Sequence, residues 1–278
     1  SWEAGRRVTV LSHAGMARAT LGVSRLAGTP LPELTCDSWR PALSIREFQT
    51  SFALSEIDAS VRISGPIRAA IDGAVEVRAG AGAARAWGVA VVEAGRLPSV
   101  DVVGAIARRA RLEPSDLTLV VVPGPSLAGV TQIAGRLNEC VLFTLETSLG
   151  ESIEPVASVL GSVPVAPCGR EAVLLPDDLI HYAGRVVLVV DAPPAWDLGA
   201  LADSLVFRSS PAYGCRFADL LAAAGGVFEA VPGLNDLNKV AEIAIFDRQT
   251  GRTARAGGVD MAILEAAWRE AEERGHER

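Results

Sequence analysis

One stretch of the chain, residues 117–146, restricts the possible folds more than any other. It begins with LTLVVV, in which four of the six residues are β-branched, as is typical of a buried strand. Pro123, Gly124 and Pro125 end this strand, and the Ser126 hydroxyl can cap a following helix. The sequence therefore predicts a strand, a tight turn and one long helix. The apolar side of that helix recurs every three or four residues, at Leu127, Val130, Ile133, Leu137 and Val141.

Three polar residues share another side of this predicted helix. Gln132, Arg136 and Glu139 are spaced i, i+4 and i+7, so their head groups can meet. An exposed ion pair between Arg136 and Glu139 is the commoner explanation of such spacing, and it would be worth roughly 0.3–0.5 kcal/mol. Spacing alone leaves a surface pair and a functional pair both open.

The surrounding string, VVVPGPSLAGVTQIAGRLNEC, resembles the central motif of the methenyltetrahydromethanopterin cyclohydrolase family, approximately V-A-P-T-x-S-x-x-G-S-x-Q-I-x-x-R-V-V-E. The match is long and has no gaps. The resemblance implies that Arg136 and Glu139 are the catalytic pair, and that Gln132 and Ser126 bind substrate. The matching positions are Pro123, Ser126, Gly129, Gln132, Ile133, Arg136 and Glu139.

Weaker matches to the same family extend along nearly the whole chain. Residues 64–69 (SGPIRA) resemble G-S-G-P-x-R-A, and residues 178–186 (DLIHYAGRV) resemble D-A-I-L-Y-G-G-R-V. Residues 161–167 (GSVPVAP) resemble G-S-x-P-I-A-P and are expected to form an extended connector that acts as a hinge between lobes. Further substrate-binding residues implied by these matches are Gln49, Ser64, Gly65, Arg68, Asp178, Tyr182 and Tyr213.

The chain also departs from the family pattern. A Thr-Asn pair of the family has become Pro176-Asp177, and two residues, one of them acidic, are missing near Tyr213. Family members carry a few tens of residues before the segment that resembles SWEAG. We therefore expect either a shortened paralogue or a chain from which an N-terminal part has been removed.

Composition narrows the functional classes. The net charge of −7 and the pI near 5.1 argue against a nucleic-acid-binding surface. The four cysteines and three histidines are scattered, so neither a disulfide framework nor a metal site is predicted. Without a leader pattern or a long apolar run, a cytoplasmic chain without a membrane span is expected. The mean hydropathy of +0.29 favours a surface covered by another subunit.

The order of predicted elements indicates an α/β (α+β) fold. A strand at residues 87–94, a helix at 100–110 and the strand at 117–122 form a β-α-β unit, for which parallel pairing is the default. Neither G-x-G-x-x-G nor G-K-[ST] follows these strands, which argues against nucleotide-binding loops. Residues 242–256 predict a hairpin and residues 261–273 a closing helix. We expect two lobes with a ligand cleft between them, and a division of the chain into residues 1–66, 67–160 and 161–278.

The family resemblance implies a reaction. It is the opening of a methenyl-pterin cation by water to an N5-formyl pterin in one-carbon metabolism, with Glu139 as general base and Arg136 orienting it. The ligand would be a tetrahydromethanopterin-type pterin. No metal or redox cofactor is implied, and the family's trimeric state implies a homo-oligomer. The alternative is a paralogue that binds a tetrahydropterin without this activity and acts in biosynthesis or handling of the one-carbon carrier. A serine or cysteine hydrolase, suggested only by the adjacent Ser12 and His13 and by the scattered cysteines, lacks a G-x-S-x-G motif.

Overall fold

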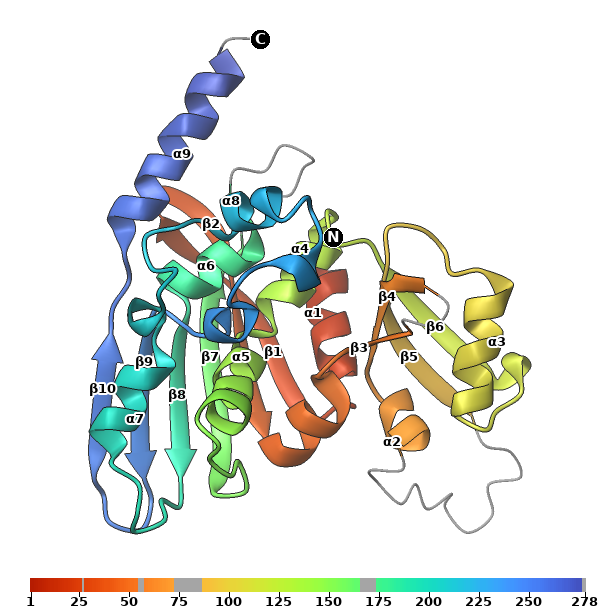
Figure 1. Ribbon diagram of the computed structural model, residues 1–278, viewed down its shortest axis with the longest axis horizontal. Helices are drawn as coiled ribbons and strands as arrows, with labels where there is room; N and C mark the ends of the chain where they lie inside the picture. Colours follow the sequence, from red (N-terminus) through yellow and green to blue (C-terminus); the bar gives the residue numbers. More distant parts are fainter. Residues whose placement is uncertain (27, 55–57, 73–86, 166–173, 277–278) are drawn as a thin grey trace.

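The computed structural model describes residues 1–26, 28–54, 58–72, 87–165 and 174–276, and within them it shows a mixed α/β fold with two sheets (Figure 1). The predicted fold class is confirmed. The large sheet has the strand order β1-β2-β7-β8-β9-β10, and the small sheet has the order β3-β4-β5-β6. The small sheet is an insertion in the chain between β2 and β7, so the large sheet is built from both ends of the sequence.

The large sheet buries one face under helices. It consists of β1 (Ala17–Leu26), β2 (Thr29–Trp39), β7 (Val156–Pro164), β8 (Arg185–Val190), β9 (Glu242–Asp247) and β10 (Thr253–Gly257). All neighbouring strands are antiparallel except β8 and β9, which are parallel and joined through α7 (Leu198–Leu205). Alternate residues such as Leu34, Val159 and Leu188 are fully buried against the helices, as expected for a sheet with one covered face.

The small sheet contains the predicted β-α-β unit. Its strands are β3 (Phe52–Leu54), β4 (Asp58–Ser64), β5 (Gly88–Glu93) and β6 (Leu117–Val122), with α2 (Ile67–Asp72) after β4. β5 and β6 are parallel and are connected by α3 (Val100–Arg109), which confirms the prediction. Antiparallel pairing adds β4 and β3. The core of this sheet is separate from that of the large sheet.

Helix α1 (Trp2–Ser12) packs closely on α4 (Leu127–Ala134), beside the large sheet and facing the small one (Figure 1). The close approach depends on Gly5, because a Cβ atom there would lie 2.4 Å from Thr131 Cβ. Helix α6 (Pro176–Ala183) packs against α4 as well. Both helices therefore meet at the segment that carries the predicted catalytic pair.

Two sequence predictions about the backbone are wrong. The predicted long helix is divided into α4, α5 (Leu137–Phe143) and a π-helical turn, η3 (Thr144–Ser148). The break falls at Gly135 and Arg136, and Gly135 also lets α1 approach closely, because a Cβ atom there would be 2.6 Å from the Thr9 side chain. The expected hinge at residues 161–167 instead begins as the end of β7, in the interior of the large sheet, where Pro164 is the last residue of the strand. Residues 166 and 167 lie outside the described ranges.

The remaining described elements are a hairpin and further helices. The predicted hairpin is confirmed by the antiparallel β9 and β10, and the closing helix is α9 (Met261–His276). The others are η1 (Ala42–Gln49), η2 (Pro114–Asp116), η4 (Phe207–Ser209), α8 (Phe217–Ala223), η5 (Phe228–Ala230) and η6 (Leu234–Leu237). No helix in the described ranges is both long and apolar enough to cross a membrane. Strands of the large sheet come from all three of the sequence ranges proposed above, and that division stays a prediction.

Candidate active site

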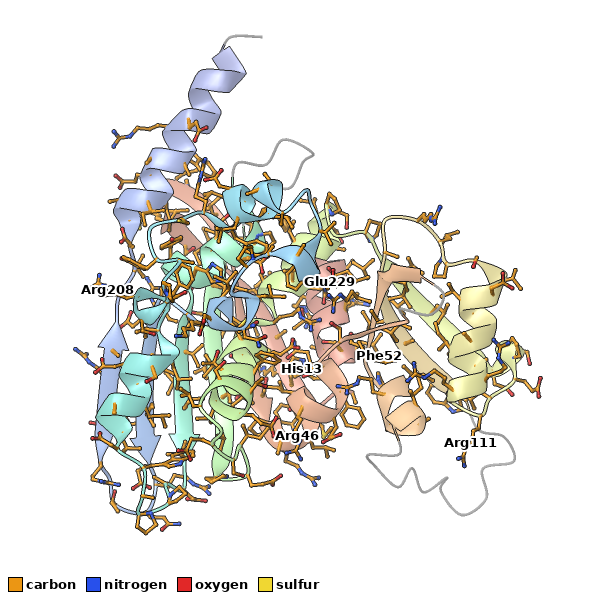
Figure 2. The ribbon with its side chains drawn as sticks, viewed as in Figure 1. His13, Arg46, Phe52, Arg111, Arg208 and Glu229 are labelled. Atoms are coloured by element: carbon orange, nitrogen blue, oxygen red, sulfur yellow. The ribbon has the colours of Figure 1, made fainter. Side chains whose placement is uncertain are left out.

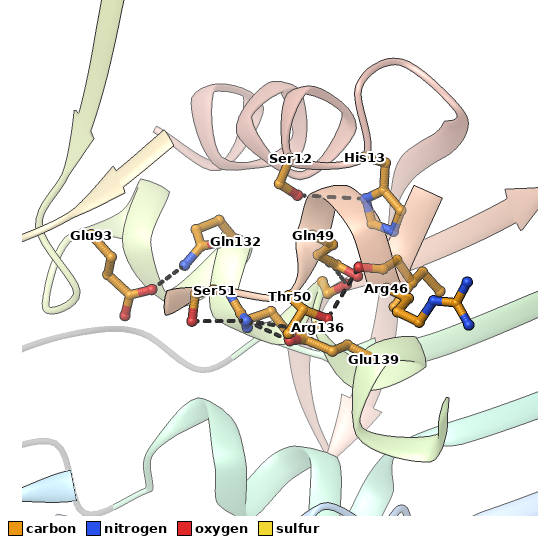
Figure 3. Close-up of polar contacts among 12 residues, drawn as sticks. Ser12, His13, Arg46, Gln49, Thr50, Ser51, Glu93, Gln132, Arg136 and Glu139 are labelled. Atoms are coloured by element: carbon orange, nitrogen blue, oxygen red, sulfur yellow. Dashed lines mark hydrogen bonds and ion pairs between the residues drawn. The ribbon is translucent and has the colours of Figure 1, made fainter. Parts of the chain in front are cut away.

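The break between α4 and α5 brings Arg136 and Glu139 together. Arg136 stands at the start of α5, and its Nη2 lies 2.7 Å from Glu139 Oε1 and 2.7 Å from Oε2. The side chains are only 17% and 11% exposed, so this is a buried ion pair rather than a solvated one. In Figure 3 the pair ends a row of polar side chains that begins at Glu93 on β5. The surface-pair explanation left open by the spacing is therefore wrong.

Gln49 holds the broken helix in place. It is 1% exposed at the end of η1, and its Nε2 donates to the Gly135 carbonyl over 3.0 Å. A helix break leaves backbone carbonyls without their usual partners, and this amide satisfies one of them. Arg68 fixes η1, which carries Gln49, since its Nη1 donates to the carbonyls of Arg46 and Thr50, both over 2.7 Å. Of these two residues predicted to bind substrate, Gln49 contacts the helix break and Arg68 holds the helix that carries Gln49.

Glu93 and Ser51 belong to the site, although the sequence analysis did not identify them. Glu93, the last residue of β5, accepts a hydrogen bond from Gln132 Nε2 over 2.8 Å, and Arg136 Nη2 donates to Ser51 Oγ over 3.3 Å. The position of Glu93 in the sequence could have identified it. It ends the first of two parallel strands, and ligands of α/β folds gather beyond the carboxyl ends of such strands.

Carboxyl groups lie around the guanidinium of Arg136. Burial acts to lower the pKa of Arg136, but the charges of Glu139 and Glu93 outweigh it and raise this pKa above its ordinary value. Half-buried Asp177, the second residue of α6, also interacts electrostatically with Glu93 and Arg136. Burial first, and then the charge of Asp178, raises the pKa of Asp177 to about 7. Asp177 is also absent from the sequence prediction, although the change from Thr-Asn to Pro176-Asp177 pointed to it.

A buried hydrogen-bond network connects Asn138 of α5 with Ser38 and His13. His13 Nδ1 donates to the Thr9 carbonyl over 2.8 Å, and its Nε2 accepts from Ser38 Oγ over 3.2 Å. Asn138 Nδ2 donates in turn to Ser38 Oγ over 3.1 Å. Burial lowers the pKa of His13 to about 4, which keeps the ring neutral. Both ring nitrogens are engaged, so Ser12 and His13 (Figure 3) serve the fold and not a hydrolytic triad.

Two of the other predicted binding residues begin helices. Ser126 caps α4 by accepting from Gly129 N over 3.0 Å. Asp178 accepts from the backbone N–H groups of Leu175 and Phe217, and thereby joins the starts of α6 and α8. These contacts account for the two side chains within the fold, and their role in binding a ligand stays a prediction.

The remaining predicted binding residues make their described contacts away from the pair. Tyr182 donates to the Cys215 carbonyl over 2.6 Å, and Tyr213 bonds to Asp260. Ser64 is buried at the end of β4. The backbone N–H of the next residue, Gly65, donates to the Phe48 carbonyl over 2.7 Å. A role for these four in ligand binding also stays a prediction.

The fold and site together define a class. The α/β fold with its two sheets holds a buried, hydrogen-bonded carboxylate–guanidinium pair. Further acidic groups lie close to this pair, and a neutral histidine belongs to the hydrogen-bond network next to α5. Such an arrangement suits proton transfer from water to a carboxylate held in place by a planar cation.

Comparison with known proteins names the family within this class. The family described as "Cyclohydrolase (MCH)" matches residues 1–268, and the chain belongs to this family. Among curated relatives, the methenyltetrahydromethanopterin cyclohydrolase of Xanthobacter autotrophicus is 32% identical, over 94% of this chain and 78% of the relative. That of Methylobacterium nodulans is 27% identical over 96% and 84%. With the enzyme of Methylobacterium organophilum the identity is 33%, over 64% of this chain and about half (55%) of the relative.

Proposed function

We propose that the chain hydrolyses a methenyltetrahydromethanopterin-type cation to its N5-formyl product. The observation that carries the proposal is the Arg136–Glu139 pair, buried and bonded at 2.7 Å in a chain of the cyclohydrolase family. Burying charged groups costs free energy, and a pair that served only as a surface contact would remain solvated. The burial of this pair therefore favours a functional role.

The charges around the pair fit a cationic substrate. The charges of Glu139, Glu93 and Asp177 interact with that of Arg136, so these four groups carry a net negative charge when the three carboxyl groups are ionised. A delocalised cation that leaves water regains electrostatic stabilisation from such surroundings. The same charges disfavour an anionic substrate, which separates this proposal from phosphoryl or carboxyl chemistry.

The proposed reaction consumes one water. Its oxygen bonds to the methenyl carbon while Glu139 takes one of its protons, which gives a neutral tetrahedral adduct. One of the two bonds from this carbon to ring nitrogen then breaks. The departing nitrogen keeps the electron pair and takes up a proton, the remaining hydroxyl becomes the formyl carbonyl, and one proton in all is released to solvent. Atoms and charge balance, because a cation and water give a neutral product and a proton.

The neighbouring residues have separate tasks in this scheme. Arg136 Nη2 donates to Glu139 Oε1 and lies 2.7 Å from Oε2, which orients the carboxylate toward the attacking water. Gln132 is 2% exposed, and its amide nitrogen is fixed by Glu93, so its amide oxygen is directed by that bond and can position the water. Ser51 fixes the guanidinium from the side of the small sheet.

The proposal is tested by following the methenyl chromophore with purified protein. Glu139→Gln keeps size and much of the hydrogen bonding but cannot accept a proton, so turnover is expected to fall by about two to four orders of magnitude, with little change in affinity. Arg136→Lys keeps the charge but loses the planar fork, and should also slow turnover. Glu113→Gln, at an exposed carboxylate before η2, is the matched control. Equal rates for Glu139→Gln and wild type would remove Glu139 as the base.

A paralogue that binds a tetrahydropterin without hydrolysing it is the second candidate. The observation in its favour is Pro176-Asp177, which places a carboxyl group near Arg136 where the family pattern has Thr-Asn. The same assay separates the two. Binding of the methenyl compound by the wild-type protein, with the chromophore intact, would falsify the cyclohydrolase proposal and establish the binder.

A further inference from the structure

An exposed segment joins the two sides of the candidate site. Residues 225–230, between α8 and the buried Val231, are all exposed, and we call them the strap. Gly225 and Gly226 at the start of the strap and Gly233 beyond its end have φ values of +69°, +78° and +68°, in the left-handed region that favours glycine. In Figure 2, Glu229 of the strap lies between the body of the large sheet and the small sheet.

Arg62 of the small sheet holds the strap. Its guanidinium pairs with Glu229 and lies over the Phe228 ring, 5.3 Å from the ring centroid. Arg62 stands directly opposite Glu93 in the pairing of β4 with β5, and residues so paired project from the same face of a sheet. The strap is therefore anchored on the face of the small sheet from which Glu93 reaches Gln132.

The other side of the strap rests on the large sheet's helices. The rings of Phe228 and Phe217 are 5.9 Å apart and inclined at 60°. Phe217 begins α8, and its backbone N–H is bound by Asp178 of α6, the neighbour of Asp177. The strap thus links the Glu93 side of the site with the Asp177 side. Few contacts fix it. Among the described residues these include the Arg62 contacts, the Phe228–Phe217 contact and backbone bonds within the strap and to the end of α8.

We propose that the strap is a gate over the candidate site, latched closed by Arg62 on Glu229 and Phe228, and that it must open for a ligand to enter. That it gates this reaction rests on the proposed function, whereas the latch itself does not. An exposed ion pair and one cation–π contact are weak interactions, so the latch can open without unfolding either sheet. Gly225, Gly226 and Gly233 supply the backbone freedom that opening requires.

The latch is tested on the ligand-free protein by amide hydrogen exchange of peptides that span residues 225–233. Arg62→Met loses both contacts and Glu229→Gln loses the ion pair, so each is expected to speed exchange there severalfold, Arg62→Met more strongly. Asp191→Asn, which breaks the exposed ion pair with Arg248, is the matched control and should leave the strap unchanged. Unaltered exchange in both latch variants would overturn the latch.

Gating is tested by locking the strap. The variant Arg62→Cys/Glu229→Cys, in a chain that carries Cys168→Ser and Cys215→Ser, is cross-linked with a short bismaleimide. Methenyl hydrolysis by the linked protein is expected to fall at least tenfold, while each single-cysteine variant treated in the same way keeps its rate. Full turnover by the linked protein would overturn the gate. Should the unlinked protein bind but not hydrolyse the methenyl compound, the proposed function fails alone, and slower binding after linking still decides the gate.

Discussion

The side-chain amide of Gln49 lies 3.0 Å from the backbone carbonyl of Gly135, and this bond joins the end of η1 to the break between α4 and α5. The position of Arg136 follows from it, because Arg136 is the next residue. The reacting pair is therefore placed by a residue that does not touch it.

Gln49→Leu is expected to destabilise the protein and slow turnover together. Without the amide, the Gly135 carbonyl is left without this donor, which costs about 1–3 kcal/mol in the free energy of unfolding. Urea denaturation measures that loss, and the methenyl assay measures kcat. Gln249→Ala, in the exposed hairpin turn, is the control and should change neither. A stable variant with the full rate would show that the break holds without Gln49.

Asp177→Asn is expected to change the pH dependence of the reaction. Because the pKa of Asp177 is raised to about 7, its carboxyl is largely protonated at pH 6 and ionised at pH 8. The negative charge of the site, and with it the affinity for a cation, should therefore increase from pH 6 to pH 8 in the wild type. A profile of kcat/KM against pH should show an ionisation near 7 that Asp177→Asn lacks. Asp219→Asn, at an exposed carboxylate on α8, should keep it. Superimposable profiles for wild type and Asp177→Asn would contradict this assignment.

His181 is expected to make stability fall in acid. Burial lowers its pKa to about 4, against a hydrogen bond to the Leu237 backbone that acts to raise it. Between the unfolded value near 6.5 and the folded value, the unfolded chain binds a proton that the native protein does not, so stability is lost as pH falls through this window. The loss is on the order of 3 kcal/mol by pH 4. His181→Leu should remove it, so the difference in unfolding free energy between the two proteins should vary with pH. Parallel curves would contradict this.

The uncovered face of the large sheet is expected to bind a second copy of the chain. Trp39, Leu160 and Phe246 are 43%, 42% and 44% exposed there, on strands β2, β7 and β9. The same face carries Arg185 and Glu242, charges of opposite sign that a second copy could pair. Sedimentation velocity at micromolar concentration should show an oligomer, and Phe246→Glu should shift it towards monomer. Thr253→Glu, at an exposed position on the edge strand β10, tests charge alone. A wild-type monomer would contradict the prediction.

Sequence reasoning succeeded where the signal was local. LTLVVV and its turn identified β6, and the spacing of Arg136 and Glu139 survived the helix break because the two residues remain within one turn of each other. The close approach of α1 at Gly135, where a Cβ atom would meet the Thr9 side chain, is a contact that no periodicity in residues 117–146 contains. Ser51, Glu93 and Asp177 reach the site from three separate segments, so their relation to Arg136 exists only in the folded chain.

The insertion of the small sheet between β2 and β7 makes activity depend on the stability of that sheet. Ser51, on the connection into that sheet, contacts Arg136, and Glu93, at the end of its strand β5, holds Gln132. A shift of the small sheet therefore moves both supports of the reacting groups at once. Its core, around Ile63 and Val92, is separate from that of the large sheet. Weakening that core should thus inactivate the protein at temperatures where the large sheet is still folded.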